Sequence, residues 1–127
     1  MINSGSYQLY IYIKKKIKIQ IGSLGFNEFP KGYYVYTGSA MRNLFQRVER
    51  HKRSNKTIRW HIDYLLSDSN VKIKNVILHY SDIKEECHYN NELINKGAKV
   101  IVMNFGSSDC NLCDSHLLYI GTKLTLP

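Results

Sequence analysis

Proline and cysteine are scarce in this sequence, and long apolar runs are absent. The chain has two prolines and three cysteines among 127 residues, which fits neither a collagen-like chain nor a secreted disulfide framework. No apolar run approaches the roughly 18 residues that a transmembrane helix requires, and residues 1–6 lack the pattern of a signal peptide. We therefore expect a single domain spanning residues 1–127, located in the cytoplasm.

Acidic residues are also few. The chain has 10 Asp and Glu against 18 Lys and Arg, so its net charge is +8 and its isoelectric point is near 9.4. Such a charge attracts polyanions, so we expect nucleic acid as a partner and no membrane partner. Simple solubility is the alternative explanation of the charge.

Alternation of apolar and polar residues predicts strands over residues 7–13 and 17–21, and a β-branched and aromatic run predicts a third over 32–38. The first two strands are separated only by a lysine cluster, Lys14, Lys15 and Lys16. We expect them to form a hairpin with a basic tip. The first sheet would then have three strands.

Helical spacing follows the third strand. Met41, Leu44, Phe45 and Val48 have the spacing of an amphipathic helix, with Ser39 available as N-cap. Further helices are predicted over residues 58–66 and 82–97, the latter starting at a capping box at residues 82–85. Strands are predicted over residues 71–80, 99–105 and 116–120. This mixture places the chain in the α+β class.

One acidic side chain lies on the apolar face of the predicted helix 82–97. A helical wheel places Glu86 beside Ile83 and Leu93, and a carboxylate removed from water requires a cation or hydrogen-bond donors. Magnesium, a hard cation with oxygen ligands, suits one carboxylate together with a substrate phosphate. A salt bridge from Glu86 to Arg47 or to a lysine is the alternative.

Tyrosine is frequent, with ten residues in the chain. Most tyrosines pack in proteins with a solvated hydroxyl group. A tyrosine can act as general base where positive charge lowers its pKa from about 10 toward the working pH. Arg47 and His51 lie one helical turn apart on the edge of the apolar stripe and, with the lysine hairpin, could supply that charge.

Three motifs, taken in their order along the chain, resemble the GIY-YIG nuclease superfamily. They are residues 5–7, 36–38 and 44–51. Longer phrases resemble one branch of it, a small and poorly characterised archaeal and bacterial family that occurs alone or attached to DNA-repair enzymes of the endonuclease III type. These phrases are residues 29–40, 59–65, 86–87, 105–110 and 115–117.

The resemblance implies a central three-stranded antiparallel sheet flanked by helices, here with extra carboxy-terminal strands. It also implies a DNA endonuclease, with a role in DNA repair, that hydrolyses one phosphodiester bond with one divalent cation, Mg²⁺ or Mn²⁺. Tyr7 would be the general base that takes a proton from water, Glu86 would hold the metal, and Arg47 would stabilise charge on the phosphate. Tyr36 would bond to water or phosphate. His51, on the face of Arg47, could help to place either of these.

Basic residues outside the motifs are candidates for nucleic-acid binding, with DNA favoured over RNA from the family context. They are Lys14, Lys15, Lys16, Arg42, Arg50, Lys52, Arg53 and Arg59. The same context suggests a DNA-repair glycosylase as a partner. The competing hypothesis is an accessory module of the same fold that binds nucleic acid without cleaving it. Only metal-assisted hydrolysis requires the carboxylate of Glu86.

The cysteines have a spacing found among metal ligands. Cys110, Cys113 and His116 form a C-x₂-C-x₂-H run, and Cys87 could complete a Cys₃His zinc site. Small buried thiols or a disulfide are the alternatives.

Overall fold

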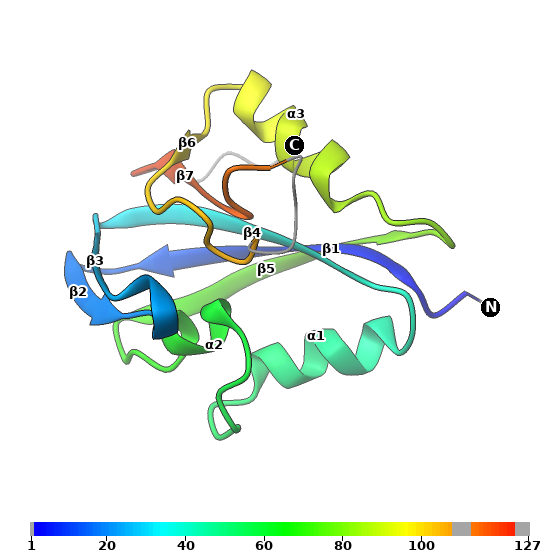
Figure 1. Ribbon diagram of the computed structural model, residues 1–127, viewed down its shortest axis with the longest axis horizontal. Helices are drawn as coiled ribbons and strands as arrows, with labels where there is room; N and C mark the ends of the chain where they lie inside the picture. Colours follow the sequence, from blue (N-terminus) through cyan, green and yellow to red (C-terminus); the bar gives the residue numbers. More distant parts are fainter. Residues whose placement is uncertain (1, 108–112, 124–127) are drawn as a thin grey trace.

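A five-stranded antiparallel sheet forms the centre of the computed structural model, which describes residues 2–107 and 113–123 (Figure 1). The strands are β1 (Gly5–Ile13), β4 (Gly32–Ala40), β5 (Val71–Tyr80), β6 (Lys99–Val100) and β7 (Leu117–Gly121). Their order across the sheet is β5–β1–β4–β7–β6. The α+β class is confirmed, but the sheet has five strands, since β7 and β6 extend it beyond β4.

Helices cover both faces of this sheet. In Figure 1, α1 (Leu44–Lys52) and α2 (His61–Leu66) lie below it and α3 (Glu86–Asn95) lies above it. Leu9 of β1 belongs to one buried cluster with Leu44 of α1 and Leu65 of α2. The preceding residue of β1, Gln8, hydrogen-bonds His79, whose ring stacks on a tyrosine of α3. Successive β1 side chains thus serve the two layers in turn.

The two central strands place the tyrosine motifs together. β1 and β4 pair over their whole length, with Tyr7 opposite Gly38 and Leu9 opposite Tyr36. Tyr7 and Tyr36 are therefore diagonal neighbours on one face of the sheet, and their ring centroids lie 6.4 Å apart.

The predicted strand 17–21 does not join the main sheet. It forms β2 (Ile17–Gln20), which pairs with β3 (Phe26–Phe29) in a separate two-stranded ribbon. β3 is a strand that the sequence pattern does not predict. Both sides of β1 are occupied by β4 and β5, so no edge of β1 is open to the strand that follows it.

The first two helices are shorter than predicted. α1 begins after Asn43, because Ser39 still belongs to β4. The predicted core positions Met41 and Phe45 are 38% and 56% exposed. The side chains that α1 buries are Leu44, Val48 and His51. α2 begins at His61 instead of residue 58.

The third helix differs most from its prediction. α3 begins at Glu86, and its N-cap Glu85 makes no side-chain capping hydrogen bond, so the predicted start at a capping box over residues 82–85 is wrong. Ile83 is 60% exposed, and the residue that α3 buries fully is Asn90. The wheel that put Glu86 beside Ile83 is therefore wrong, since Ile83 precedes the helix.

None of the helices within the described residues is both long enough and apolar enough to span a bilayer.

Candidate active site

A pocket of about 350 Å³ opens where the Tyr7 end of β1 meets β4, α1 and the start of α3. Four of the five residues expected to carry catalysis line it, although they come from four different elements. The lining residues are Tyr7, Tyr36, Gly38, Ser39, Arg47, Arg59, Trp60, His61, Lys84, Glu86, Gly106 and His116. The fifth, His51, lies directly behind Tyr7 in the core.

Tyr7 is held beneath the backbone of β4. A Cβ atom built on Gly38 would lie 2.6 Å from the Tyr7 hydroxyl oxygen, well inside contact distance. Glycine is thus required at position 38 for the ring to occupy this place. The side chain is 2% exposed, so Tyr7 contributes to the pocket wall while being almost entirely packed.

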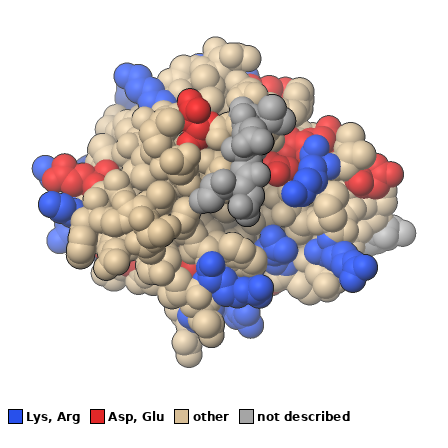
Figure 2. Space-filling view, in the orientation of Figure 1, with Lys and Arg blue, Asp and Glu red and all other residues tan. Residues whose placement is uncertain are grey.

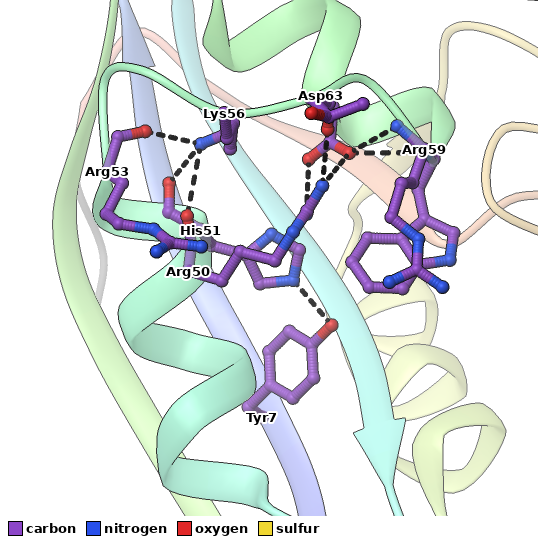
Figure 3. Close-up of polar contacts among 9 residues, drawn as sticks. Tyr7, Arg50, His51, Arg53, Lys56, Arg59 and Asp63 are labelled. Atoms are coloured by element: carbon purple, nitrogen blue, oxygen red, sulfur yellow. Dashed lines mark hydrogen bonds and ion pairs between the residues drawn. The ribbon is translucent and has the colours of Figure 1, made fainter.

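Tyr7 and His51 form one hydrogen-bonded pair. The Tyr7 hydroxyl oxygen lies 2.8 Å from His51 Nε2 (Figure 3). Burial lowers the pKa of His51 to about 4, so the imidazole is neutral near pH 7. Its Nδ1 is buried and has no hydrogen-bond partner among the described residues. A neutral imidazole with Nε2 unprotonated can accept the phenolic proton.

The electrostatics at Tyr7 differ from the sequence-based expectation. Burial raises the pKa of Tyr7 to about 12, and the charge and hydrogen bond of Arg47 act in the opposite direction. The predicted influence of Arg47 thus has the right sign but is smaller than the effect of burial. Removing the phenolic proton therefore needs a nearby acceptor, and His51 is in place for it.

Tyr36 stands beside the pair and is itself 7% exposed. Its ring centroid lies 6.2 Å from that of His51. Burial raises its pKa well above the usual value for tyrosine. Gly106, at φ +71°, approaches so closely that an added Cβ would be 3.0 Å from the Tyr36 ring. Tyr36 is therefore neutral at ordinary pH and acts as a hydroxyl at the pocket wall.

Arg47 belongs to a cluster of guanidinium groups around the single tryptophan. The Cζ atoms of Arg47, Arg50 and Arg59 lie 4.7, 4.5 and 5.1 Å from the centre of the Trp60 ring. Arg47 also donates a long hydrogen bond of 3.4 Å to the carbonyl of Ser39. Arg47 and Arg59 also line the pocket, where guanidinium groups can bind an anion.

Arg50, a nucleic-acid candidate, is engaged inside the protein (Figure 3). It donates two hydrogen bonds of 3.1 Å to the carboxylate of Asp63, which is fully buried. Asp63 also accepts from the backbone N–H groups of Arg59 and Trp60. Burial alone would raise the pKa of Asp63, but these bonds outweigh it and leave that pKa below its ordinary value. The ion pair fixes the segment that carries Arg59 and Trp60.

Glu86, the first residue of α3, brings the only carboxylate among the described residues that line the pocket. Its Oε2 is buried and lacks a hydrogen-bond partner among the described residues. The alternative salt bridge to Arg47 or a lysine is absent from the ion pairs of the described part of the chain. A carboxylate oxygen left this way is costly unless a cation meets it. Together with oxygen atoms of solvent and of a phosphate group, this carboxylate oxygen would make a ligand set that suits Mg²⁺ or Mn²⁺.

Four basic candidates adjoin the pocket. Arg42, Arg50, Arg53 and Arg59 line a second hollow of about 720 Å³, which shares Arg47, Arg59 and Trp60 with the first. Lys and Arg side chains gather over α1 and α2 in the lower half of Figure 2. Together the two hollows make a continuous basic surface.

The other basic candidates lie elsewhere. Lys14, Lys15 and Lys16 are exposed at the opposite end of β1 from Tyr7, roughly 23 Å along the strand at about 3.3 Å per residue. Lys52 pairs with Glu49 on α1 and lines a separate hollow beside β5. Lys14, Lys15 and Lys16 are therefore not among the residues that line the pocket.

The cysteine motif lies against the far wall. Cys87, next to Glu86, forms a disulfide with Cys113, one of the alternatives that the sequence left open. His116 lines the pocket, and its Nε2 is 3.7 Å from Cys87 Sγ. Burial lowers the pKa of His116, with the charge of Glu86 acting in the opposite direction. Cys110 lies outside the described residues.

Sequence reasoning missed Asp63 and Lys56. Lys56 donates to the carbonyls of His51 and Arg53 at 2.7 Å, closing the end of α1. Asp63 stands in the first turn of α2, where acids favour helix starts. That signal was hidden because the predicted helix began at residue 58.

The fold and the site together define an α+β protein with a basic, tyrosine-lined pocket around one buried carboxylate oxygen. Residues 6–126 match the model of the family described as domain of unknown function DUF123, and the chain belongs to this family. No curated protein and no solved structure matches the sequence.

Proposed function

We propose that this protein is a divalent-metal-dependent DNA endonuclease whose site is of the GIY-YIG type. Support comes from the meeting of Tyr7, Tyr36, Arg47 and Glu86 at one pocket, although these residues span nearly 80 positions of sequence. The antiparallel unit β5–β1–β4, with helices on both faces, agrees with the sheet that the resemblance implies. The basic surface over α1 agrees with a phosphate-rich ligand.

The observation that carries the proposal is Oε2 of Glu86, which has no hydrogen-bond partner within residues 2–107 and 113–123 and lies in a pocket whose other described lining groups are cationic or neutral. Phosphate binding alone gains nothing from a carboxylate, because like charges repel. Hydrolysis does gain, since a bound divalent cation neutralises charge on the phosphate and on the leaving oxygen. Glu86 would hold that cation.

The chain's own residues supply the proton transfers. Tyr7 donates its phenolic hydrogen to His51 Nε2 and takes a proton from the attacking water as the water oxygen bonds to phosphorus. The bond from phosphorus to the leaving oxygen breaks in the same step, and that oxygen takes a proton from solvent. His51 therefore ends protonated, and Tyr7 regains its hydroxyl. Arg47 donates hydrogen bonds to the non-bridging phosphate oxygens as charge grows there. Tyr36 orients the water or a phosphate oxygen through its hydroxyl.

The test is nicking of supercoiled plasmid and of labelled branched and single-stranded DNA, with Mg²⁺ or Mn²⁺ against EDTA. Glu86→Gln and Tyr7→Phe should each reduce metal-dependent cutting by about 10²- to 10⁴-fold. Glu92→Gln, an exposed carboxylate on the same helix, and Tyr33→Phe, at the far end of β4, are the matched controls and should cut normally.

Two outcomes would contradict the proposal. DNA binding without cutting on every substrate would favour the accessory module of the same fold. Cutting that neither Glu86→Gln nor Tyr7→Phe alters would mean that the activity comes from a contaminant or from another site.

A further inference from the structure

A second cluster of metal-ligating side chains lies one residue beyond Glu86. Cys87, Cys113 and His116 each offer a ligand atom, and the three atoms lie within 4.8 Å of one another. The two cysteines are 26 positions apart in the sequence. The fold therefore brings the start of α3 and the segment before β7 to one point, beside the pocket but on sulfur and nitrogen ligands.

The distances suit a tetrahedral ion. Zinc binds cysteine sulfur at about 2.3 Å and histidine nitrogen at about 2.0–2.1 Å, so two such ligands at a tetrahedral angle stand about 3.6 Å apart. The distance from Cys87 Sγ to His116 Nε2 is 3.7 Å. An ion bound by both cysteines requires their two sulfur atoms to lie farther apart than in a disulfide. Rotation of the cysteine side chains can provide this separation.

The backbone around the cluster is fixed on several sides. His116 donates its N–H to the Phe105 carbonyl at 2.8 Å and accepts from the Thr37 N–H at 3.0 Å. Asn90 of α3 donates to the Ser115 carbonyl at 2.7 Å. These bonds join α3, β4 and the segment before β7, so the ligands are positioned without the metal.

The surroundings of Cys113 and His116 are also typical of residues that bind a metal ion. Cys113 and His116 are 7% and 6% exposed. The backbone of Gly106 lies close to His116, since a Cβ atom added to Gly106 would be 3.5 Å from His116 Cβ, and backbone groups near a ligating histidine commonly orient it. Two thiolates and one neutral imidazole would balance the charge of a divalent ion in this buried place.

We infer that Cys87, Cys113 and His116 bind a zinc ion when the two cysteines are reduced. A thiol reductant supplies the two electrons and two protons that convert the disulfide to two thiols, and is itself oxidised to a disulfide. Zinc then displaces both thiol protons and binds two thiolates and His116 Nε2. Soft sulfur ligands select zinc over magnesium, so this site and the Glu86 carboxylate take different metals.

The ion would have a structural role. It ties the first turn of α3 to the segment before β7, on which His116 faces the same pocket as Glu86. Zinc would thus hold the Glu86 backbone against the sheet under reducing conditions, as the disulfide does under oxidising ones.

The first measurement is the zinc content of the full chain, purified with a phosphine reductant and passed over a desalting column. We expect about one zinc per chain, held by the three protein ligands with a solvent molecule in the fourth position. Cys113→Ser and His116→Ala should lose the ion, whereas His88→Gln, a histidine of α3 outside the cluster, should keep it. Oxidation of wild-type protein to the disulfide should release it.

A second measurement does not depend on how the variants fold. Cobalt added to reduced wild-type protein should give the visible bands of a tetrahedral site and a sulfur-to-cobalt charge-transfer band, and zinc should abolish both. Reduced wild-type protein that holds zinc well below one equivalent and shows no charge-transfer band would overturn the inference. So would a cobalt spectrum unchanged in Cys113→Ser.

None of these readouts involves DNA, and so the two proposals fail separately. A protein that binds zinc and cuts nothing keeps this site and loses the proposed function, and the reverse result does the opposite.

Discussion

Protonation of His51 should make a large contribution to the loss of stability between pH 6.5 and pH 4. The side chain is 2% exposed, and burial lowers its pKa from 6.5 to about 4. The attraction of Asp63 favours the proton, whereas Lys56, Arg50 and Arg47 disfavour it. The folded protein therefore keeps His51 neutral in a pH range where the unfolded chain protonates it.

The sign and size follow from this difference. Above pH 6.5 His51 is neutral in both the folded and the unfolded state, and its full contribution to folding stability is present. As the pH falls toward 4, only the unfolded state gains a proton at this residue, so stability falls. At about 1.4 kcal/mol per pH unit, the loss over the interval is roughly 3 kcal/mol. Below pH 4 both states are protonated and this contribution changes no further. A loss of that size is a large part of the stability of an ordinary domain.

The assay is urea unfolding followed by circular dichroism at pH 7, 6, 5 and 4. His51→Gln keeps a polar group near the Tyr7 hydroxyl but cannot titrate, so the variant should lose roughly 3 kcal/mol less than wild type across the interval. His88→Gln removes an exposed histidine, whose side chain is 61% accessible, and should follow wild type. Equal pH dependence in wild type and His51→Gln would refute the assignment of His51 as buried and neutral.

Three further predictions concern the scaffold and the surface. Asp63→Asn should lower the free energy of unfolding by about 3–5 kcal/mol because it removes the charge partner of Arg50, whose side chain is 14% exposed. Asp82→Asn, at an exposed residue, should stay within about 0.5 kcal/mol. Urea unfolding at pH 7 distinguishes the two variants, and equal effects would contradict the ion pair. Gly38→Ala should lower the free energy of unfolding by about 1–3 kcal/mol by overpacking, and it should reduce nicking because the added methyl group displaces the Tyr7 ring. An unaltered urea midpoint would count against that contact. Arg53→Ala should weaken DNA binding and reduce the slope of log affinity against log salt by about one, which fluorescence anisotropy over a salt series measures. Alanine substitutions at residues 14–16 should leave cutting unchanged in the nicking assay.

Strands with strong local patterns were predictable from sequence, whereas their partners were not. The alternation around Tyr7 located β1, and the β-branched and aromatic run around Tyr36 located β4, because such residues favour strands. The pairing of β1 with β5 depends on residues 58 to 75 positions apart in the sequence. No local pattern reports such a contact, so the hairpin to residues 17–21 was the wrong choice of neighbour.

The candidate site shows the same division. Tyr7, Arg47 and Glu86 were selected by residue type and by resemblance, and the structure places all three at one pocket. The burial of Glu86 was argued from a helical wheel that included Ile83, although the helix begins only at Glu86. Oε2 of Glu86 is instead buried by the residues that form the pocket wall. Asp63 was missed because its role comes from Arg50 on another helix, a contact that only the folded chain forms.

The position of Trp60 makes it a spectroscopic probe of the site. It is the single tryptophan of the chain, it lines both basic hollows, and three guanidinium groups and the His51 ring surround it. Any phosphate that draws Arg47 or Arg59 away from the indole changes the field at its excited state. Ligand occupancy can therefore be followed by intrinsic fluorescence, without a label and in the absence of turnover.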